Sequence, residues 1–411
     1  MTRAHRVKVI VLFGGLALWL NAAAAQDTTG SAGALDLRVF ASHHYHIHTN
    51  LSREETVPFG RHMDAVFTQY ERRFASYTKR SGGLMPLFLF RTQDQYLAFL
   101  KRHGIAAEGS GGMFFVTHSI QGLATWAEGH RRAQTFRTLQ HEGFHQFAWH
   151  YLGRDLPTWM NEGLAQYFED AVILDSGMEL GLANPHRIEH VRDALRFGYA
   201  IDCQDLMNLS HREWSQTLQT NASRSELLYA QAWSIVYFMI HGDNARYLSS
   251  FEVYLRLLSN GQPHDKAFRN AFGYSPERAL EDRWRSFALS QTADAVNVAA
   301  GRLEFLGAAL DYKQQRDESM PRDIGELRRD LQRRGFTLTR TAHGLKQELH
   351  AVDGELFTYT RPGGETSEFL ILEPSARGLP PRIAAPGLSP EPNLVWEFGR
   401  DGQPTFEIEY R

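Results

Sequence analysis

The sequence predicts an α+β protein in which strands come first along the chain and helices follow. Short strand-like runs occupy residues 37–120, periodic helical segments fill residues 133–290, and a smaller mixture of helices and strands comes after them. Strands and helices that segregate along the chain are typical of α+β folds rather than of alternating α/β folds. We therefore expect a mixed sheet and a helical part within residues 37–290, followed by a small separate α+β domain at residues 291–411.

Composition limits the class of protein further. Hydrophobic residues make up 43% of the 411 residues, which is enough to form a large buried core. The 44 basic and 47 acidic side chains give a formal net charge of −3. A chain of this charge without a long basic run is not expected to bind nucleic acid as its main partner. The single cysteine, Cys203, excludes an internal disulfide framework and a metal site built from several cysteines. We expect this cysteine to be buried rather than nucleophilic.

Residues 1–25 have the pattern of a secretory signal peptide. Arg3, Arg6 and Lys8 precede an apolar run over residues 9–20, and small residues lead to a predicted cleavage site after Ala25. The alternative is a retained membrane anchor, but this run is short for a hydrocarbon layer ~30 Å thick. We expect an exported bacterial protein, periplasmic or extracellular, with a Sec-type signal and no membrane span in the mature chain. A flexible lead is expected over residues 26–36.

Hydrophobic periodicity predicts the elements of the first domain. Apolar alternation or continuous apolar character predicts strands at residues 37–50, 84–90 and 113–120. Apolar residues at helical spacing predict helices at residues 59–77 and 93–103, and then throughout most of 133–290. Glycine and proline mark the expected breaks between the later helices, at Gly153, Pro185, Gly242, Gly261 and Pro276.

The second domain is expected to begin with helices at residues 293–317 and at a charged segment that ends near residue 334. Short strands are predicted after them, at residues 336–340, 356–360, 369–372, 395–398 and 405–410. Eight of the 15 prolines fall in residues 362–404, which confines those strands to short pieces. We find no cluster of chemically active residues in this domain.

The segment from His141 to His145 reads HEGFH and so contains the HExxH pattern. Residues four apart lie on one face of a helix, so both imidazoles can reach the same metal ion. Glu142 lies about 100° round the helix and can face a metal-bound water without binding the metal. The two histidines share their face with apolar residues such as Phe144, so we expect them to be buried.

A third ligand is available on the next predicted helix. Glu162 follows His145 by 17 residues, in a segment that begins near Pro157. Gly153 is expected to end the preceding helix, so a short loop can fold the second helix back onto the first. The glutamate would then complete a His₂Glu site with a fourth position open to water, as in catalytic zinc sites.

These motifs resemble those of the gluzincin metallopeptidases. HEGFH followed by Asn161-Glu162-Gly163 is similar to the aminopeptidase-like branch with its NEG element. Residues 45–50 and 156–169 resemble an uncharacterised, mostly bacterial family of the peptidase-MA-like group. The resemblance covers roughly residues 37–290 and is specific over 135–170.

The resemblance implies a zincin-like fold and a role for each residue of the motif. His141, His145 and Glu162 would bind Zn²⁺, and Glu142 would act as the general base. Glu169 lies seven residues after the third ligand and therefore on the same helix face. It is expected either as a carboxylate that supports a metal ligand or as a surface residue.

Two further positions bear on catalysis and specificity. Tyr229, 67 residues after Glu162, lies in a segment similar to the helix that supplies a catalytic tyrosine in the aminopeptidase-like branch. We expect its phenol to donate a hydrogen bond to the oxyanion, with a place in the core as the alternative. Phe114 stands where that branch has the glutamate that anchors a substrate's free amine. This departure from the pattern removes the amine anchor and therefore favours an endopeptidase over an aminopeptidase.

Two other histidine patterns compete with this site. His186 and His190 belong to an inverted HxxEH motif, but they point away from the apolar face of their predicted helix, and Arg187 and Arg192 indicate a solvated surface there. We interpret this motif as a coincidence. Four more histidines alternate along the first predicted strand, and we expect an exposed strand face, with a second metal site as the alternative: His43, His44, His46 and His48.

The sequence thus predicts a secreted zinc-dependent peptidase that hydrolyses peptide or protein substrates. The alternative is a non-catalytic cell-envelope module on a zincin fold that binds an extended peptide or another partner. A third hypothesis is hydrolysis of an amide outside proteins, such as a cell-wall peptide stem.

Overall fold

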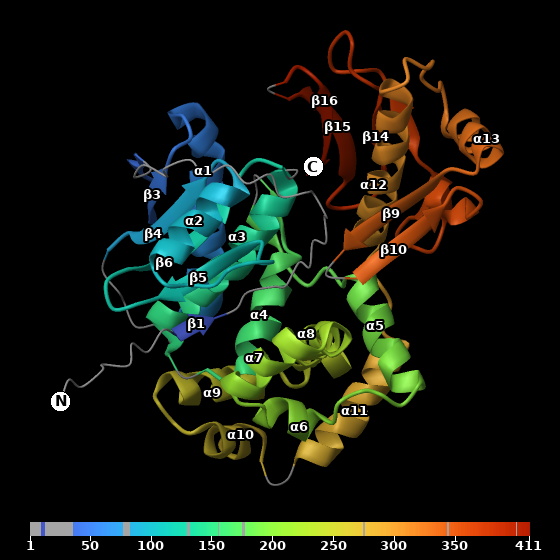
Figure 1. Ribbon diagram of the computed structural model, residues 1–411. Coiled ribbons are helices and arrows are strands. Elements are labelled where there is room, and N and C mark those ends of the chain that lie inside the picture. Colours follow the sequence, from blue (N-terminus) through green and yellow to red (C-terminus); the bar gives the residue numbers. More distant parts are fainter. Residues whose placement is uncertain are drawn as a thin grey trace. The chain divides into compact units, whose positions relative to one another are not determined.

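Figure 1 shows the computed structural model of the chain. It describes residues 10–12, 36–76, 83–129, 132–154, 156–174, 177–273, 276–342, 345–399 and 401–411. The predicted signal peptide, apart from residues 10–12, its cleavage site and the predicted lead up to residue 35 lie outside the described residues. Among the described residues, no helix combines the length and the apolar character needed to cross a bilayer.

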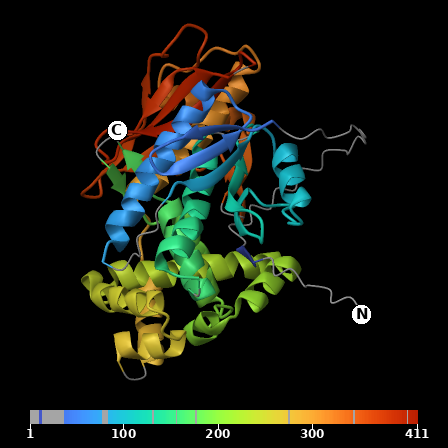
Figure 2. The ribbon, with the colours of Figure 1, turned by 90° about the vertical axis from the view of Figure 1, so that its left-hand side faces the viewer.

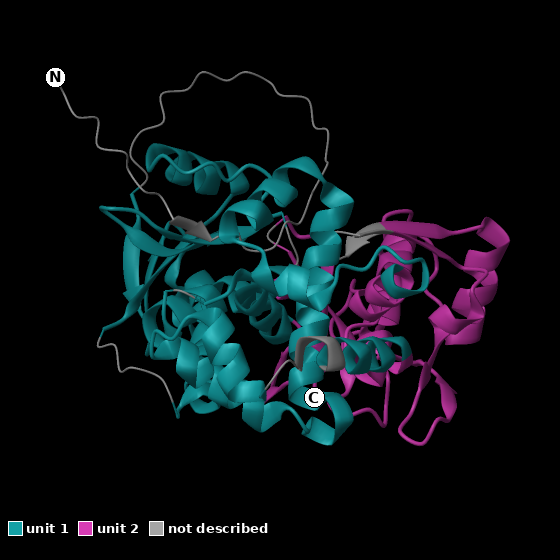
Figure 3. Ribbon diagram, turned by 90° about the horizontal axis from the view of Figure 1, so that it is seen from below, with its two compact units in different colours: residues 1–130, 134–169, 194–289 teal, residues 131–133, 170–193, 290–411 magenta. Residues whose placement is uncertain are grey.

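The chain divides into two compact units, coloured separately in Figure 3. Unit 1 consists of Met1–His130, Gln134–Glu169 and Ala194–Leu289. Unit 2 consists of Arg131–Ala133, Asp170–Asp193 and Ser290–Arg411. The segment 170–193, which the sequence analysis placed in the first domain, thus belongs to the same unit as the C-terminal residues.

Unit 1 contains a six-stranded mixed sheet with the strand order β1-β5-β6-β4-β3-β2. Strand β4 is parallel to β3 and β6, while β2, β5 and β1 are antiparallel to the strands they join. β1 lies within the predicted signal segment and pairs with β5, with Leu12 opposite Phe114. The bounds are β1 (Ile10–Leu12), β2 (Arg38–Ala41), β3 (Tyr45–Thr49), β4 (Met85–Phe90), β5 (Gly112–Val116) and β6 (Gln121–Trp126).

Helices cover both faces of this sheet, which is why its central strands are apolar on both sides. Helix α2 (Gln93–Arg102) packs on one face, where Phe88, Phe99 and Phe115 belong to one buried cluster. Helices α1 (Arg53–Phe74) and α3 (Arg132–Phe147) form the second layer. Tyr70 of α1 shows their contact, because its hydroxyl donates a hydrogen bond to the Gln140 carbonyl of α3.

The remaining helices of unit 1 follow α3 along the chain. A π-helical turn, η1 (Ala148–Leu152), directly continues α3, and α4 (Thr158–Glu169) folds back after it. In Figures 1 and 2, α3 and α4 lie between the sheet and a group formed by the later helices. The bounds of that group are α6 (Cys203–Asn208), α7 (His211–Thr220), α8 (Ala222–Ala245), α9 (Leu248–Ser259), α10 (His264–Phe272) and α11 (Pro276–Ser290).

A close helix contact fixes α4 against α8. A Cβ atom placed on Gly163 of α4 would lie 2.6 Å from the carbonyl oxygen of Ala232 and 2.7 Å from a methyl carbon of Val236, both on α8. Only glycine permits this approach, because a contact of that length with backbone cannot be relieved by a side-chain rotation. Gly163, which directly follows the predicted ligand Glu162, thus sets the distance between α4 and α8.

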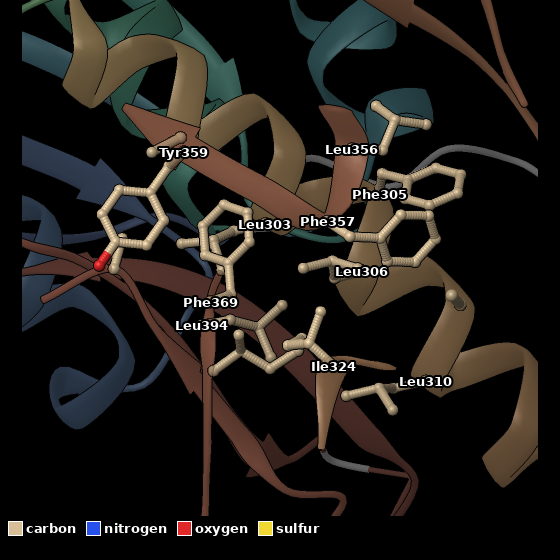
Figure 4. Close-up of a cluster of buried hydrophobic side chains, with 14 of the residues drawn as sticks. Leu303, Phe305, Leu306, Leu310, Ile324, Leu356, Phe357, Tyr359, Phe369 and Leu394 are labelled. Atoms are coloured by element: carbon tan, nitrogen blue, oxygen red, sulfur yellow. The ribbon is translucent and has the colours of Figure 1, made fainter. Parts of the chain in front are cut away.

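Unit 2 is built around α12 (Ala295–Gln314), whose apolar residues pack against short strands and α13 (Ile324–Arg334). Figure 4 shows Phe305, Leu306 and Leu310 of α12 beside Phe357 and Ile324 in this core. Its elements before α12 are β7 (Val172–Leu174), β8 (Gly177–Glu179) and α5 (Pro185–Arg196), of which the last three residues belong to unit 1. The later ones are β9 (Thr337–Ala342), β10 (Leu345–His350), η2 (Gly354–Phe357), β11 (Thr358–Thr360), β12 (Thr366–Glu368), β13 (Leu370–Leu372), β14 (Arg382–Ala384), β15 (Pro392–Phe398) and β16 (Pro404–Tyr410).

The α+β class predicted from the sequence is confirmed, and the differences lie in single elements. Helix α1 begins six residues earlier than expected, because Ser52 and Glu55 form a capping box and Pro58 fits within the first turns. The first predicted strand is a hairpin of β2 and β3, because the Asp64 carboxylate holds the turn through Ser42 and the amide of His44. The strands β6, β10, β12 and β14 and the hairpin β7–β8 were not predicted.

We expect Gly163→Ala to destabilise unit 1 by ~1–3 kcal/mol, because the added methyl group forces α4 and α8 apart. Gly111→Ala is the matched control, since its Cβ would lie 3.7 Å from Thr138 in ordinary contact. Urea unfolding of both variants measures the difference. Equal midpoints for the two variants would show that the helix contact is not tight.

Candidate metal centre

The structure brings the three predicted metal ligands together in unit 1. His141 and His145 lie on α3, and Glu162 lies in the second turn of α4. One possible ligand atom from each residue lies within 4.8 Å of the others, and all three residues are buried. Among the described residues, no other group of three or more histidine, cysteine, aspartate or glutamate side chains meets this condition.

The distances in this group suit a small cation. Oε2 of Glu162 lies 3.5 Å from Nε2 of His141 and 3.5 Å from Nε2 of His145. A tetrahedral zinc ion with bonds of about 2.0–2.1 Å has ligand atoms separated by roughly 3.4 Å. The separation is therefore long for a hydrogen bond and suitable for two ligands of one ion.

Buried atoms without hydrogen-bond partners are a second feature of the group that a cation would fit. Within the described part of the chain, Nδ1 and Nε2 of His145 and Oε2 of Glu162 are buried without a hydrogen-bond partner. A buried polar atom without a partner costs about 1–3 kcal/mol, and more if it is charged. A metal ion bound by Nε2 and Oε2 would remove most of this cost, so the residues present fit the ion that the sequence implies.

Glu169 supports the first histidine of the group. Its Oε2 lies 3.0 Å from Nδ1 of His141, and its side chain is 20% exposed. This contact occupies the ring nitrogen that faces away from Glu162 and leaves Nε2 for a metal, which is how a carboxylate orients a metal-binding histidine. The hydrogen bond to His141 and the low exposure are those expected for a supporting carboxylate, whose role in metal binding stays a prediction.

Glu142 is held beside the group by the edge of the sheet. It is 2% exposed, and its Oε2 accepts a hydrogen bond of 2.8 Å from the backbone N–H of Phe114 on β5. Burial raises the pKa of Glu142 above its ordinary value, although the two histidines and the Phe114 amide act in the opposite direction. A carboxylate whose pKa is raised toward neutrality is suited to take up and release a proton.

Charge compensation within the group is strong. Burial lowers the pKa of His141, but its contacts with Glu162 and Glu169 outweigh this and raise the pKa to about 10. For Glu162, burial raises the pKa, and the neighbouring His145 and His141 outweigh this and lower it to about 2. Without a metal, the structure therefore holds a proton on His141 and a negative charge on Glu162.

Tyr229 lies on α8 and is 7% exposed. Ala232, one turn further along α8, is the residue that Gly163 contacts, so the close helix contact brings the phenol toward Glu162. Burial raises the pKa of Tyr229 well above its ordinary value, and the charge of Glu162 is the next contribution, with Glu142 and Glu169 adding smaller ones. The predicted oxyanion donor is thus within electrostatic reach of the group.

Sequence reasoning missed the contacts that align α3 with α4. The side-chain amide of Gln140 donates a hydrogen bond of 2.6 Å to the carbonyl of Phe168, next to Glu169. The backbone carbonyl of Gln140 accepts a hydrogen bond from the Tyr70 hydroxyl of α1. The only signal for this role was a polar residue directly before His141 on a face that had to be buried.

Among the described residues, the competing histidines belong to no group of three or more possible metal ligands. His186 contacts Gln347, and Arg187 is 5% exposed because it pairs with Asp170. The predicted solvated character is therefore wrong at Arg187, where an acidic partner that sequence could not reveal makes burial favourable.

The strand histidines and the cysteine are also accounted for. His44 stacks on Phe67 and His48 stacks on Phe88, while His46 is exposed. Cys203 is buried as expected, and burial raises the pKa of its thiol.

Comparison with known proteins adds a family without an assigned role. Residues 135–265 match the model of a family described as a protein of unknown function (DUF1570). No curated protein matches the chain. The matched region contains both histidines of the HExxH motif, the glutamate of α4 and Tyr229, so the residues of this centre all fall within it.

The raised pKa of His141 predicts how the metal-free protein responds to pH. A group whose pKa rises from 6.5 to about 10 on folding contributes stability below about pH 6.5 and loses it as the pH approaches 10. We expect the melting temperature of chelator-treated protein to fall between pH 7 and 9.5. His141→Gln should show a weaker dependence, and equal slopes for the two proteins would contradict the coupling.

Proposed function

We propose that unit 1 is a zinc-dependent peptidase of the gluzincin type. The observation that carries the proposal is that three possible metal-ligand atoms converge. Nε2 of His141 lies close to atoms of His145 and Glu162 that are buried without a hydrogen-bond partner among the described residues. When Glu142 and Glu169 are counted with Glu162, three carboxylates lie beside the two imidazoles, so the surroundings attract a cation even when His141 is protonated. Two imidazoles and one carboxylate with a fourth position for water are the donor set of catalytic zinc sites.

When bound, zinc would polarise the scissile carbonyl and make water a nucleophile near neutral pH. Glu142 would take the proton of the attacking water and pass it to the leaving amine. Its hydrogen bond from the Phe114 amide holds the carboxylate beside the ligands. Tyr229 would donate its phenolic proton in a hydrogen bond to the oxyanion.

Strand β5 favours internal cleavage of extended peptides. Phe114 stands where the aminopeptidase-like branch has an amine-binding glutamate, so no carboxylate at this position anchors a free N-terminus. β5 pairs on one side with β6 and on the other with β1, which lies in the segment expected to be removed on export. Removal of β1 would leave an edge to which an extended peptide can add as a strand.

The first test separates the base from a ligand. Glu142→Gln should keep about one zinc per chain, while cleavage of a denatured-protein mixture falls by about 10²–10⁴-fold. Glu162→Ala should lose both the metal and the activity. Elemental analysis and chelator-sensitive proteolysis provide the two measurements.

Glu71→Gln, an exposed substitution on α1, serves as the control and should change neither quantity. Substantial activity in Glu142→Gln would exclude it as the base. A protein that takes up zinc and binds peptide without cleaving it would support the non-catalytic module instead.

A separate prediction concerns Glu169. Glu169→Gln replaces the charged acceptor of His141 by a neutral one, and we expect zinc affinity to fall by about 10–100-fold. Competition with a chromogenic chelator measures this affinity, with Glu71→Gln again as the control. An unchanged affinity would show that the contact with His141 Nδ1 has no part in metal binding.

A further inference from the structure

Helix α7 places a tryptophan directly against Tyr229. The helix spans His211–Thr220 and begins at a capping box of Ser210 and Glu213, which fixes its first turn. Trp214 follows in that turn and is 1% exposed. Its ring centroid lies 5.5 Å from that of Tyr229, with the two rings at 89°.

The indole N–H of Trp214 has no other use in the described structure. Nε1 of Trp214 is buried, and none of the described atoms accepts a well-aligned hydrogen bond from it. An unsatisfied buried donor costs about 1–3 kcal/mol, so a nearby acceptor would be strongly favoured. By contrast, Nε1 of Trp284 donates to Ser234 at 3.0 Å.

The phenol oxygen of Tyr229 is an acceptor within reach of this donor. Burial and the charge of Glu162 raise the pKa of Tyr229, whereas Trp214 lowers it, which is the effect of a donor beside the oxygen. A phenol that accepts a hydrogen bond from one side directs its own O–H elsewhere. The contact of Gly163 with Ala232 places this region of α8 against the helix that carries Glu162.

We infer that Trp214 is a positioning residue, whose indole N–H donates to the Tyr229 oxygen and so directs the phenolic O–H toward the oxyanion. This inference rests on the proposed peptidase function, because it deepens the role of Tyr229 in that reaction. Trp214 does not touch the substrate. Its contribution is the orientation of a donor that must be in place before charge develops.

A double-mutant cycle in the zinc-loaded full chain tests this role. Tyr229→Phe should lower kcat by about 10²–10³-fold, the usual cost of an oxyanion donor. Trp214→Phe keeps an aromatic ring but removes the N–H, and we expect kcat to fall roughly tenfold with KM unchanged, the value of about one hydrogen bond. In the Tyr229→Phe background, the same tryptophan substitution should have no further effect.

Trp284→Phe is the matched control, because it removes an indole donor from a different pair and should leave kcat unchanged. Equal losses for Trp214→Phe in both backgrounds would mean a structural role and would overturn the inference. A wild-type chain that binds zinc but shows no chelator-sensitive cleavage would refute the proposed function itself, and with it the inference.

The indole N–H resonances give a readout that does not depend on activity. Trp214→Phe identifies the Trp214 signal in a ¹H–¹⁵N spectrum by its disappearance. In Tyr229→Phe this signal should move upfield as it loses its acceptor, while the Trp284 signal stays in place. A Trp214 resonance unchanged by the loss of the phenol would also overturn the inference, even if Trp214→Phe fails to fold.

Discussion

The burial of ionisable groups between α3 and α4 is the constraint on which the rest of unit 1 depends. His141, His145, Glu142 and Glu162 are each at most 3% exposed, so water cannot compensate their charges. Each must therefore be matched by a neighbour, which explains the opposite pKa shifts of His141 and Glu162. Some atoms are matched by no described residue, and these converge on one point. These buried atoms without partners cost stability in the metal-free chain, and they are the atoms that a cation would bind.

Helix packing supplies the precision that this arrangement needs. Gly163 lets the backbone of α4, which carries Glu162, lie directly against α8, which carries Tyr229. Gln140 joins α3 to the end of α4 through the Phe168 carbonyl. These contacts are made by backbone atoms or buried amides, which move less than long side chains. The two ligand-bearing helices and the helix that carries Tyr229 are consequently packed against one another.

The edge strand connects the sheet to the same centre. Phe114 lies on β5 and contributes two different features. Its backbone amide holds Glu142, and its side chain is apolar where the aminopeptidase-like branch that the motifs resemble has a glutamate. The aromatic ring also faces Trp149 of η1, with ring centroids 6.3 Å apart. A single strand position thus orients the expected base and removes a charge from the region where a substrate would lie.

The sequence by itself determined the elements whose signals are local. The spacing of His141, His145 and Glu162 was enough to place them on helix faces that meet, because helical periodicity and one short loop fix that geometry. It also predicted the α+β order, the position of β4 from a continuous apolar run, and the positions of α2 and of the charged helix α13. Only the tertiary structure showed that Glu169 contacts His141, that Arg187 is buried against Asp170, and that the rings of Trp214 and Tyr229 are in contact. These depend on partners distant in the chain, and no local pattern records which distant residues share a buried volume.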